Sequence, residues 1–351
     1  MNRFFSKSSV KDVLNNLSMY RYHLIHKRIA KNILKSIEQE RGPVDSNFVK
    51  LSNEYAKDIL GWEGYAPWLY VYSAISGNFK EGWIPDNYYG KVVVPKLKGD
   101  YGKVSDLKPL SKIILKSDVL PDIAYYVNGL FFSKGYYVLD KNKLQTELFE
   151  NNDIIVYKVD NSLQGKGVLF FEKSNFDIEK VYKLGNGVFQ EYIKQHSFFD
   201  RFMNNSVATI RITTVVENSG DITVRASYLR IGRTNDSHVQ SDSHIRIPIS
   251  IQNGELDEYG YMSDWKRTIQ HPDSMTKFKG AAIPFYSKCL STAISLHKLM
   301  PFTRSVGWDM IIDKDNNVKL MEWNGYHNDI KFSEATQGPC FSDLGWDKIK
   351  S

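Results

Sequence analysis

Two carboxylates near the C-terminal end of the chain have the spacing to act together. Asp309 and Glu322 lie in two apolar runs on either side of the polar tetrad 314–317. This pattern predicts a β-hairpin closed by the tetrad. If Asp313 pairs with Val318, Asp309 lies directly opposite Glu322, and the two carboxylates face each other across neighbouring strands.

A third oxygen donor, Asn324, is expected on the same face because it follows Glu322 by two residues. Opposed carboxylates repel each other, whereas two carboxylates and an amide oxygen suit a hard cation such as Mg²⁺. We therefore predict that Asp309, Glu322 and Asn324 bind the Mg²⁺ of a nucleotide phosphate. The alternative is a surface hairpin whose acidic side chains face water.

A glycine-containing loop, residues 160–167, lies between two predicted strands, 154–159 and 168–171. The glycines would allow backbone N–H groups to wrap an anion, and Lys158 in the preceding strand adds a cation. No helix is expected after the loop, so it is neither a Walker-type loop nor a dinucleotide fingerprint. A plain turn is the alternative to a phosphate-binding loop.

Arginines supply candidate contacts to a transferring phosphate. Segments 206–217 and 221–232 flank the sequence Asn-Ser-Gly and predict a hairpin in which Arg211 and Arg225 share one face. An arginine beside the acidic hairpin could stabilise the charge of a transferring phosphate. The alternative is a salt bridge to those same acids.

Two histidines are candidate substrate contacts. His244 belongs to the polar segment 233–264, where its spacing from His238 fits no zinc motif. His327 follows the acidic hairpin directly. We expect the polar segment to be a substrate-facing loop.

The composition limits the class of protein. The chain has 351 residues, of which 42% are hydrophobic and 25% charged, enough for two or three domains with cores. It has neither an apolar run of about 18 residues nor a secretion signal, so we expect no transmembrane segment. Its two cysteines favour a cytoplasmic protein. The net charge of +6 fits an anionic small substrate and gives no argument for nucleic acid.

The N-terminal residues, 8 to about 40, are predicted to form a helix, since apolar residues recur at helical spacing. Basic residues occupy its other face, so the helix could lie on an anionic membrane surface or pack with a solvated basic face, and we favour packing. The apolar positions are Leu14, Leu17, Tyr20, Leu24, Ile25, Ile33 and Leu34, and the basic ones are Lys11, Arg21, Lys27, Arg28, Lys31 and Lys35.

Other segments predict short elements of both kinds. Residues 112–116 and 124–132 are expected to be buried, but their pattern does not decide between helix and strand. Asp140 is expected to cap the helix that follows it. The expected helices are 45–60, 141–150, 175–183 and 281–299, and the expected further strands are 90–95, 135–139 and 188–193.

Taken in order, the motifs resemble the ATP-grasp superfamily, most closely its sugar-transfer-associated, polysaccharide-biosynthesis branch. The tracts SVATIRITTVV and GWDMIIDKDNNVKLMEWN carry the most specific likeness, which covers about residues 130 to 330. The motifs are Asp140-Lys141, Lys158, Gly165 and Gly167, Gln190-Glu191-Tyr192-Ile193, Arg211, and Asp309 with Glu322 and Asn324.

The resemblance implies an α+β ATP-grasp fold in which two α+β subdomains sandwich ATP. We expect an N-terminal, helical then mixed domain at 1–135, a lid subdomain at 136–200 and a metal-binding, catalytic subdomain at 201–351. Arg211 and Lys158 would be catalytic, and Arg225, His244 and His327 would contact the substrate. The residues expected at the nucleotide are Lys141 (or Lys143), Lys158, Gln164, Gly165, Lys166, Gly167, Gln190, Glu191, Tyr192 and Ile193.

Members of this superfamily typically activate a carboxylate as an acyl phosphate and couple it to an amine. We therefore predict an ATP- and Mg²⁺-dependent carboxylate–amine ligase. It would join an amino acid or amine to the carboxylate of an anionic sugar or sugar nucleotide, such as a uronic acid, in capsule or other surface polysaccharide biosynthesis. The alternatives are a kinase of the same fold acting on a sugar or polyol hydroxyl, and a non-catalytic nucleotide-binding partner of a glycosyl-transfer complex.

Overall fold

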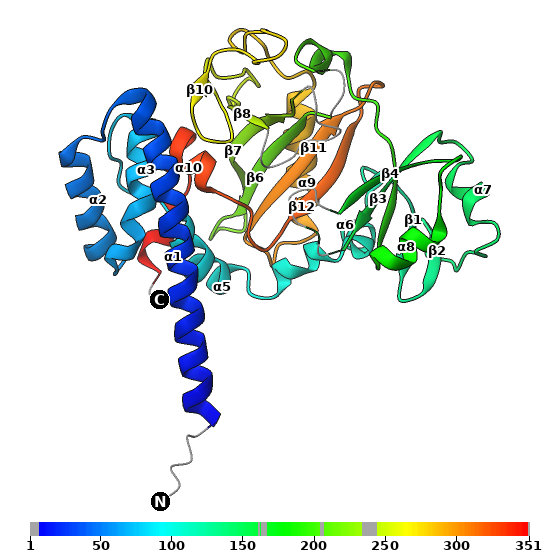
Figure 1. Cartoon of the computed structure of the whole chain (residues 1–351), viewed down its shortest axis with the longest axis horizontal. Helices are drawn as coiled ribbons and strands as arrows, with labels where there is room; N and C mark the ends of the chain where they lie inside the picture. Colours follow the sequence, from blue (N-terminus) through cyan, green and yellow to red (C-terminus); the bar gives the residue numbers. More distant parts are fainter. Residues whose placement is uncertain (1–6, 161, 163–166, 204–206, 234–243, 350–351) are drawn as a thin grey trace, which may run out of the picture. The chain divides into compact units, whose positions relative to one another are not determined.

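The computed structural model describes residues 7–160, 162, 167–203, 207–233 and 244–349, with side chains from Leu17 onward. By internal packing the chain divides into two units, whose elements are labelled in Figure 1. The expected domain boundaries at 135/136 and 200/201 stay a prediction, although packing groups residues 97–135 with the sheets of unit 2. Unit 1 comprises Met1–Lys96, Asp264–Lys266 and Asp329–Ser351, and unit 2 comprises Leu97–Ser263 and Arg267–Asn328.

Unit 1 is helical. The two expected N-terminal helices are confirmed, and Asp45 caps the second by accepting a hydrogen bond from the Asn47 backbone N–H. The C-terminal helix is fastened by Glu334, whose carboxylate accepts hydrogen bonds of 2.7 Å from the backbone N–H groups of Ile84 and Cys340. The helices are α1 (Lys7–Arg41), α2 (Ser46–Asp58), α3 (Ala66–Ser76), α4 (Asp86–Tyr88), α5 (Val94–Leu97) and α10 (Lys331–Gln337).

The strand expected at 90–95 is wrong, because this segment forms helical turns. Its run Val92, Val93 and Val94 is almost completely buried in the helical unit. Burial among helices on all sides outweighs the weak preference of valine for strands.

Two predictions around residue 140 also differ from the structure. The strand expected at 135–139 is reduced to an isolated antiparallel bridge between Val138 and Phe132, and the residues before it form a turn in which Tyr136 has φ +67°. Asp140 caps a turn rather than a helix, accepting a hydrogen bond from the Asn142 N–H, and the helix α7 (Leu144–Leu148) begins later. Local side-chain bonding of the aspartate therefore favours the turn.

Unit 2 contains a five-stranded antiparallel sheet in the order β2-β1-β5-β3-β4. The helices α7 and α8 pack against it through Leu148, Val181 and Phe189. The segments expected to be buried at 112–116 and 124–132 are α6 (Ser111–Leu115) and the hairpin β1–β2. The further elements are β1 (Asp122–Val127), β2 (Leu130–Ser133), β3 (Ile154–Val159), β4 (Val168–Glu172), α8 (Ile178–Leu184) and β5 (Gly187–Glu191).

Unit 2 also contains a seven-stranded antiparallel sheet in the order β10-β9-β8-β7-β6-β11-β12. The helix α9 (Tyr286–Lys298), expected from residue 281, packs on one face through Cys289, Ala293 and Leu296. The opposite face of the central strands carries polar side chains. The strands are β6 (Thr209–Val216), β7 (Ile222–Ile231), β8 (Ile245–Pro248), β9 (Gly260–Tyr261), β10 (Arg267–Thr268), β11 (Ser305–Ile312) and β12 (Val318–Asn324).

Two antiparallel sheets with separate covering helices give the α+β class that the sequence predicts. Within the described residues, none of the helices has the length and apolar character needed to cross a membrane.

Candidate functional site

The acidic hairpin β11–β12 places Asp309 directly opposite Glu322, as predicted. The predicted pairing of Asp313 with Val318 is wrong, because Ile312 lies opposite Val318. An extra residue in β12, Met321, forms a bulge between the two pairings and restores the register at Glu322. The two residues therefore lie opposite each other because of the bulge, which the alternation of residues along a strand does not predict.

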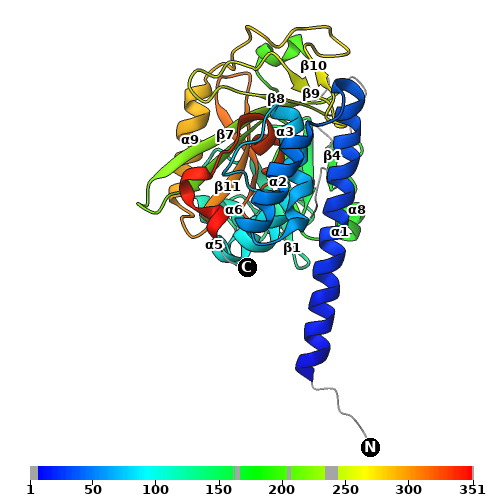
Figure 2. The same ribbon diagram turned by 90° about the vertical axis from the view of Figure 1, so that its left-hand side faces the viewer.

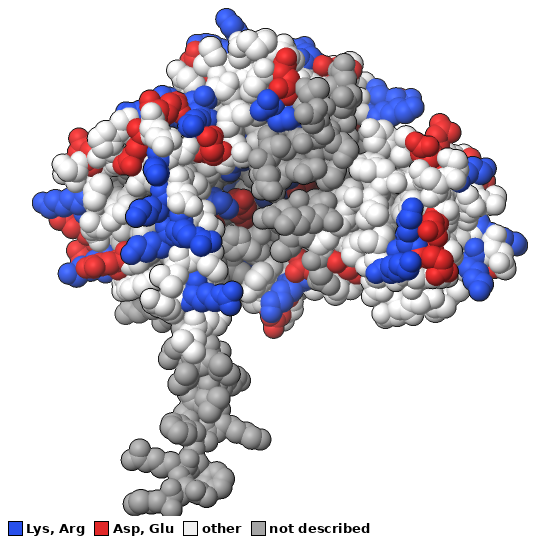
Figure 3. All heavy atoms as spheres, in the orientation of Figure 1, with Lys and Arg blue, Asp and Glu red and all other residues white. Residues whose placement is uncertain are grey.

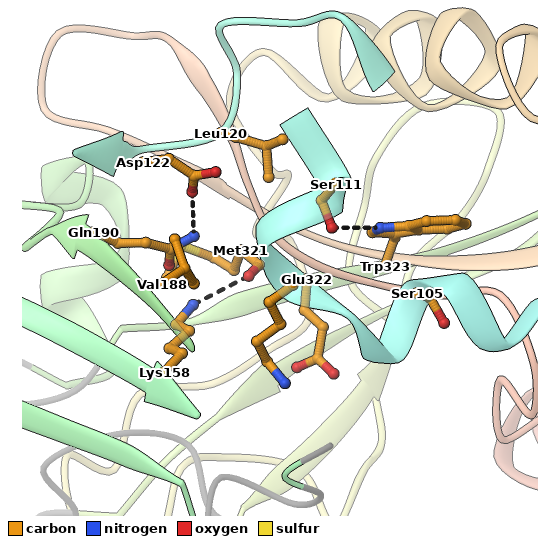
Figure 4. A pocket seen from close by; sticks show the side chains of 11 residues that line it. Ser105, Ser111, Leu120, Asp122, Lys158, Val188, Gln190, Met321, Glu322 and Trp323 are labelled. Carbon is orange, nitrogen blue, oxygen red and sulfur yellow. Dashed lines mark hydrogen bonds between the residues drawn. The ribbon is translucent and has the colours of Figure 1, made fainter. Parts of the chain in front are cut away.

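The Met321 bulge also has a contact of its own. Its carbonyl oxygen accepts a hydrogen bond of 3.0 Å from the ammonium of Lys158 on β3 (Figure 4). A bulge turns a backbone group out of the regular ladder. This hydrogen bond joins the acidic hairpin of the seven-stranded sheet to Lys158 of the five-stranded sheet.

A polar pocket lies around this contact. In Figure 4 the amide of Gln190 points to Asp122, to which it donates a hydrogen bond of 2.8 Å, and the indole of Trp323 donates to Ser111 at 3.0 Å. The pocket thus combines cationic, acidic and amide groups from both sheets. It is lined by Ser105, Lys108, Ser111, Leu120, Asp122, Lys158, Val188, Gln190, Met321, Glu322 and Trp323.

Burial controls the charges in this pocket. It lowers the pKa of Lys158 to about 8, although the carboxylates of Glu322 and Asp122 act in the opposite direction. Burial also raises the pKa of Asp122, against the hydrogen bonds from Gln190 and Tyr125. A buried lysine of this kind is an effective partner for an incoming anion, since little water competes for it.

Arg211 and Asp309 form a buried ion pair on neighbouring strands. The Arg211 guanidinium donates to both Asp309 carboxylate oxygens, at 2.5 and 2.8 Å, and Arg230 adds a contact of 2.6 Å. Burial alone would raise the pKa of Asp309, but the two arginines outweigh it and lower the pKa to about 2. The salt bridge that the sequence left as an alternative is therefore present.

Arg230 was missed by the sequence analysis because of a second bulge. The hairpin loop after Glu217 forms as predicted, but the register between β6 and β7 shifts between Thr213 and Thr214, at Arg225. Beyond the shift, Arg230 lies opposite Thr209, on the face of Arg211, whereas an unbroken ladder would turn it away. Local sequence carries no visible signal of this shift.

The predicted metal ligands supply suitable donor chemistry. Asp309 and Glu322 contribute carboxylates, and Asn324 adds an amide whose nitrogen donates a hydrogen bond of 3.4 Å to Asp309 Oδ2. In the part of the chain that the structure describes, no group of three or more His, Cys, Asp or Glu side chains is arranged to hold a metal ion. A set of two carboxylates and an amide fits Mg²⁺, which keeps several waters or phosphate oxygens as its other ligands.

The predicted nucleotide segment 190–193 ends β5 beside this pocket. Gln190 lines the pocket, Glu191 is exposed and donates its backbone N–H to the Pro121 carbonyl at 2.9 Å, and Ile193 is buried. The ring of Tyr192 packs edge-on against Phe170. Only Gln190 of this segment lines the described pocket.

The glycine loop is described only at its edges. At Gly167 an added Cβ would lie 2.4 Å from the Cβ of Ser162, so the loop closes too tightly for a larger residue. The predicted residues Gln164, Gly165 and Lys166 lie outside the described residues. Their role stays a prediction.

Four predicted residues lie away from the pocket lining that the structure describes. Lys141 is exposed in the turn before α7, and Arg225 bonds to Glu217 at 2.6 Å. His244 is buried at the start of β8, and His327 is half-buried in the segment after β12. None of the four lines the pocket that contains Lys158 and Glu322. Their assignment as nucleotide or substrate contacts stays a prediction.

Lys108 is the lysine that the sequence analysis missed. It lines the pocket with Lys158, its backbone N–H donates to Asp160 at 3.0 Å, and its ammonium donates to Ser162 at 3.4 Å. Two lysines from distant segments therefore converge beside the glycine loop. The segment around Lys108 contains Pro109 and has no clear hydrophobic periodicity, so its pattern predicts no helix or strand that would place Lys108.

A buried network supports Arg211 from behind. The ammonium of Lys98 donates to the Tyr326 carbonyl at 2.7 Å and to the Asn328 side chain at 3.1 Å. The Asn328 carbonyl in turn accepts a hydrogen bond of 3.1 Å from Arg211. Lys98 therefore helps to set the position of the arginine that holds Asp309.

Comparison with known proteins gives a family match for the C-terminal part of unit 2 and the segment after it. Residues 181–342, which include Arg211 and the acidic hairpin, match the family model described as sugar-transfer associated ATP-grasp. The fold around these residues is α+β, with two antiparallel sheets and covering helices. This matched part of the chain, a little under half of its length, is thus similar to the sugar-transfer associated ATP-grasp family.

Solved structures give distant similarities. An ADP complex of purK, N5-carboxyaminoimidazole ribonucleotide synthetase, has 11% identity and a TM-score of 0.41 over 73% of this chain and 56% of its own. Biotin carboxylase from Campylobacter jejuni has 12% identity and a TM-score of 0.48 over 92% and 69%. D-alanine-D-alanine ligase from Coxiella burnetii has 13% identity and a TM-score of 0.39 over 72% and 60%. No curated protein matches the chain significantly.

Proposed function

We propose that the chain is an ATP- and Mg²⁺-dependent carboxylate–amine ligase that works through an acyl phosphate. The observation that carries the proposal is the convergence of Lys108, Lys158 and Glu322 in one pocket, with Asp309 directly opposite Glu322. Phosphate-transfer sites need cations for phosphate oxygens and carboxylates for a metal ion, close together and shielded from water. This pocket offers both.

In this proposal the two lysines bind ATP phosphates beside the glycine loop, and the segment 190–193 frames the adenine. Asp309, Glu322 and Asn324 would hold Mg²⁺, which neutralises charge on the phosphate oxygens when bound. Arg211 and Arg230 both contact Asp309, and in this proposal their positive charges would stabilise the transferred phosphoryl group. The protein thus supplies position and charge rather than covalent chemistry.

The reaction has two balanced steps. An oxygen of the substrate carboxylate attacks the γ-phosphorus of ATP, the bond to the bridging oxygen breaks, and ADP leaves. The amine nitrogen then attacks the acyl carbon, phosphate leaves with its bridging oxygen, and the nitrogen loses one proton. The products are an amide, ADP and phosphate.

For the substrates we propose the carboxylate of an anionic sugar or sugar nucleotide, such as a uronic acid, and an amino acid or simple amine. The family description links the chain to sugar transfer, and the net charge of +6 favours an anionic substrate. The setting would be the assembly of capsule or another surface polysaccharide.

Product analysis tests the proposal. The protein is incubated with Mg-ATP and a panel of sugar acids and amines, and ADP, AMP and phosphate are measured. We expect ADP and phosphate, together with a hydroxamate when hydroxylamine replaces the amine. AMP with pyrophosphate would contradict the proposal, and ADP with a phosphorylated sugar would indicate the kinase alternative. Nucleotide binding without turnover on any acid would instead favour the non-catalytic partner.

A further inference from the structure

The helix α1 exposes apolar side chains that its sequence pattern predicts to be packed. Leu17, Tyr20 and Leu24 are exposed by 59%, 66% and 47%, although their helical spacing predicts a packed face. Among the α1 residues from Leu17 onward, those that are buried instead are Ala30 and Ile37. The helix does pack, on α3, and its basic side chains are exposed as expected, but the prediction that Leu17, Tyr20 and Leu24 belong to the packed face is wrong.

The two sides of α1 follow from helical geometry. Successive residues are rotated by about 100°. Ala30 and Ile37 share a side with His26, which accepts a hydrogen bond of 3.2 Å from Trp68 of α3. The opposite side, the outer face of α1, consists of Leu17, Tyr20, Leu24, Arg28, Lys31 and Lys35, all exposed.

The outer face and the positions that flank it, Arg21 and Lys27, are cationic, and the helix offers them no acidic partner over this stretch. Residues 13–37 contain Arg21, Lys27, Arg28, Lys31 and Lys35 but no aspartate or glutamate. All five of these side chains are exposed, and Figure 3 shows Lys and Arg side chains gathered over α1. Such a surface attracts polyanions.

The helix also extends beyond the elements that pack on it. With 35 residues it is about 50 Å long, whereas α3, its main packing partner, has 11 residues and is about 16 Å long. Figures 1 and 2 show the N-terminal half of α1 projecting past α2 and α3 of the same unit. Tertiary packing normally stabilises long helices, so a projecting half with exposed leucine and tyrosine needs a surface to rest on.

We propose that the outer face of α1 binds an anionic phospholipid surface. Interleaved basic and apolar side chains suit the lipid interface, where the cations contact headgroup phosphates and the apolar groups enter the acyl boundary. A second copy of the helix would bring cations against cations, and a nucleic acid backbone would leave the leucines in water. The proposal does not depend on the catalytic function.

Vesicle sedimentation of the full chain tests this surface. The probes are vesicles of phosphatidylcholine alone and of phosphatidylcholine mixed with phosphatidylglycerol. We expect binding to the mixed vesicles that weakens as salt is raised, and at least tenfold weaker binding to the neutral ones. The variant R21Q/K27Q/R28Q/K31Q/K35Q should lose at least tenfold in affinity, and L17S/L24S should also bind more weakly.

A matched control separates this surface from net charge. The variant K50Q/K57Q/K173Q/K180Q/K183Q removes the same number of charges from exposed lysines elsewhere. It should keep binding within about twofold, and thermal unfolding should show that each variant is folded. Equal loss in both variants, equal binding to neutral vesicles, or no binding at low salt would overturn the proposal. So would a dimer that only the α1 variants abolish, or preference for an RNA homopolymer over mixed vesicles.

Discussion

At the residue scale, the proposed site consists of charged side chains that are buried beside side chains of opposite charge. Asp309 lies under two arginines, and Lys158 lies between two carboxylates and a turned backbone carbonyl. Each of these groups is held by more than one neighbour. Substitutions therefore act on a network, and the structure predicts which of them also affect folding.

Lys108, rather than Lys141, should bind the nucleotide phosphates. We expect Lys108→Ala to weaken Mg-ATP binding roughly tenfold or more, because it removes a cation from the pocket beside Lys158. Lys141→Ala should change binding by less than about twofold, since Lys141 is exposed in a turn. The increase in unfolding temperature caused by Mg-ATP measures both. The reverse order of effects would contradict this assignment.

The two opposed carboxylates should differ in their structural role. From the sequence alone, removing either acid should relieve repulsion. Asp309→Asn, however, would leave Arg211 and Arg230 buried beside a neutral group, and we expect a loss of about 3–5 kcal/mol in the free energy of unfolding. Glu322→Gln should abolish turnover with the unfolding free energy unchanged within about 1 kcal/mol. Urea unfolding together with turnover separates the two residues, and equal stability of both variants would refute the distinction.

At the scale of elements, the sequence predicted the acidic hairpin, the glycine-loop hairpin and α1 because their apolar spacing and turn residues are strong local signals. It failed where local signals are weak or overridden. The valines at 92–94 form helical turns inside a helical unit, and Asp140 caps a turn. The bulges at Arg225 and Met321 depend on packing between strands, so alternation along one strand cannot reveal them.

The helix α10 should give the protein a measurable pH dependence. Burial raises the pKa of Glu334 from 4.5 to about 7, so the folded state binds its proton more tightly than the unfolded chain does. The stability from this group is complete below pH 4.5 and is lost as the pH rises towards 7. Between these values we expect the free energy of unfolding to fall by on the order of 2 kcal/mol from this group.

Urea unfolding at pH values from about 4 to about 8 measures the slope of the free energy of unfolding against pH. Glu334→Gln should remove the slope and lower stability at low pH, because one of the two backbone N–H donors would face an amide N–H. The exposed Glu81→Gln variant serves as the control. An unchanged slope in Glu334→Gln would show that other groups cause it.

At the scale of the whole molecule, the chain first enters unit 2 after Lys96 and leaves it for the last time after Asn328, with a short return to unit 1 at Asp264–Lys266 in between. Lys98, just inside the first passage, bonds to Asn328, just inside the second, and Asn328 holds Arg211. The two passages are thus fastened to each other beside the proposed phosphate site.

Lys98→Met should therefore separate activity from stability. Burial holds the pKa of Lys98 well below its usual range, so the charged side chain is unfavourable where it lies. We expect kcat to fall roughly tenfold, KM for ATP to stay within about twofold, and the unfolding midpoint not to decrease. The exposed Lys103→Met variant, on the same segment, should behave like the unchanged protein. A fall in stability that parallels the fall in kcat would make Lys98 a structural residue only.

The two bulges on either side of β11 have a consequence for how the large sheet assembles. A shift of one position between β6 and β7 would separate Arg230 from Asp309, and a shift between β11 and β12 would separate Met321 from Lys158. The contacts of these proposed phosphate-binding groups therefore form only in the native strand register and stabilise it. Variants that weaken them should refold more slowly, because misaligned ribbons would then compete with the native arrangement.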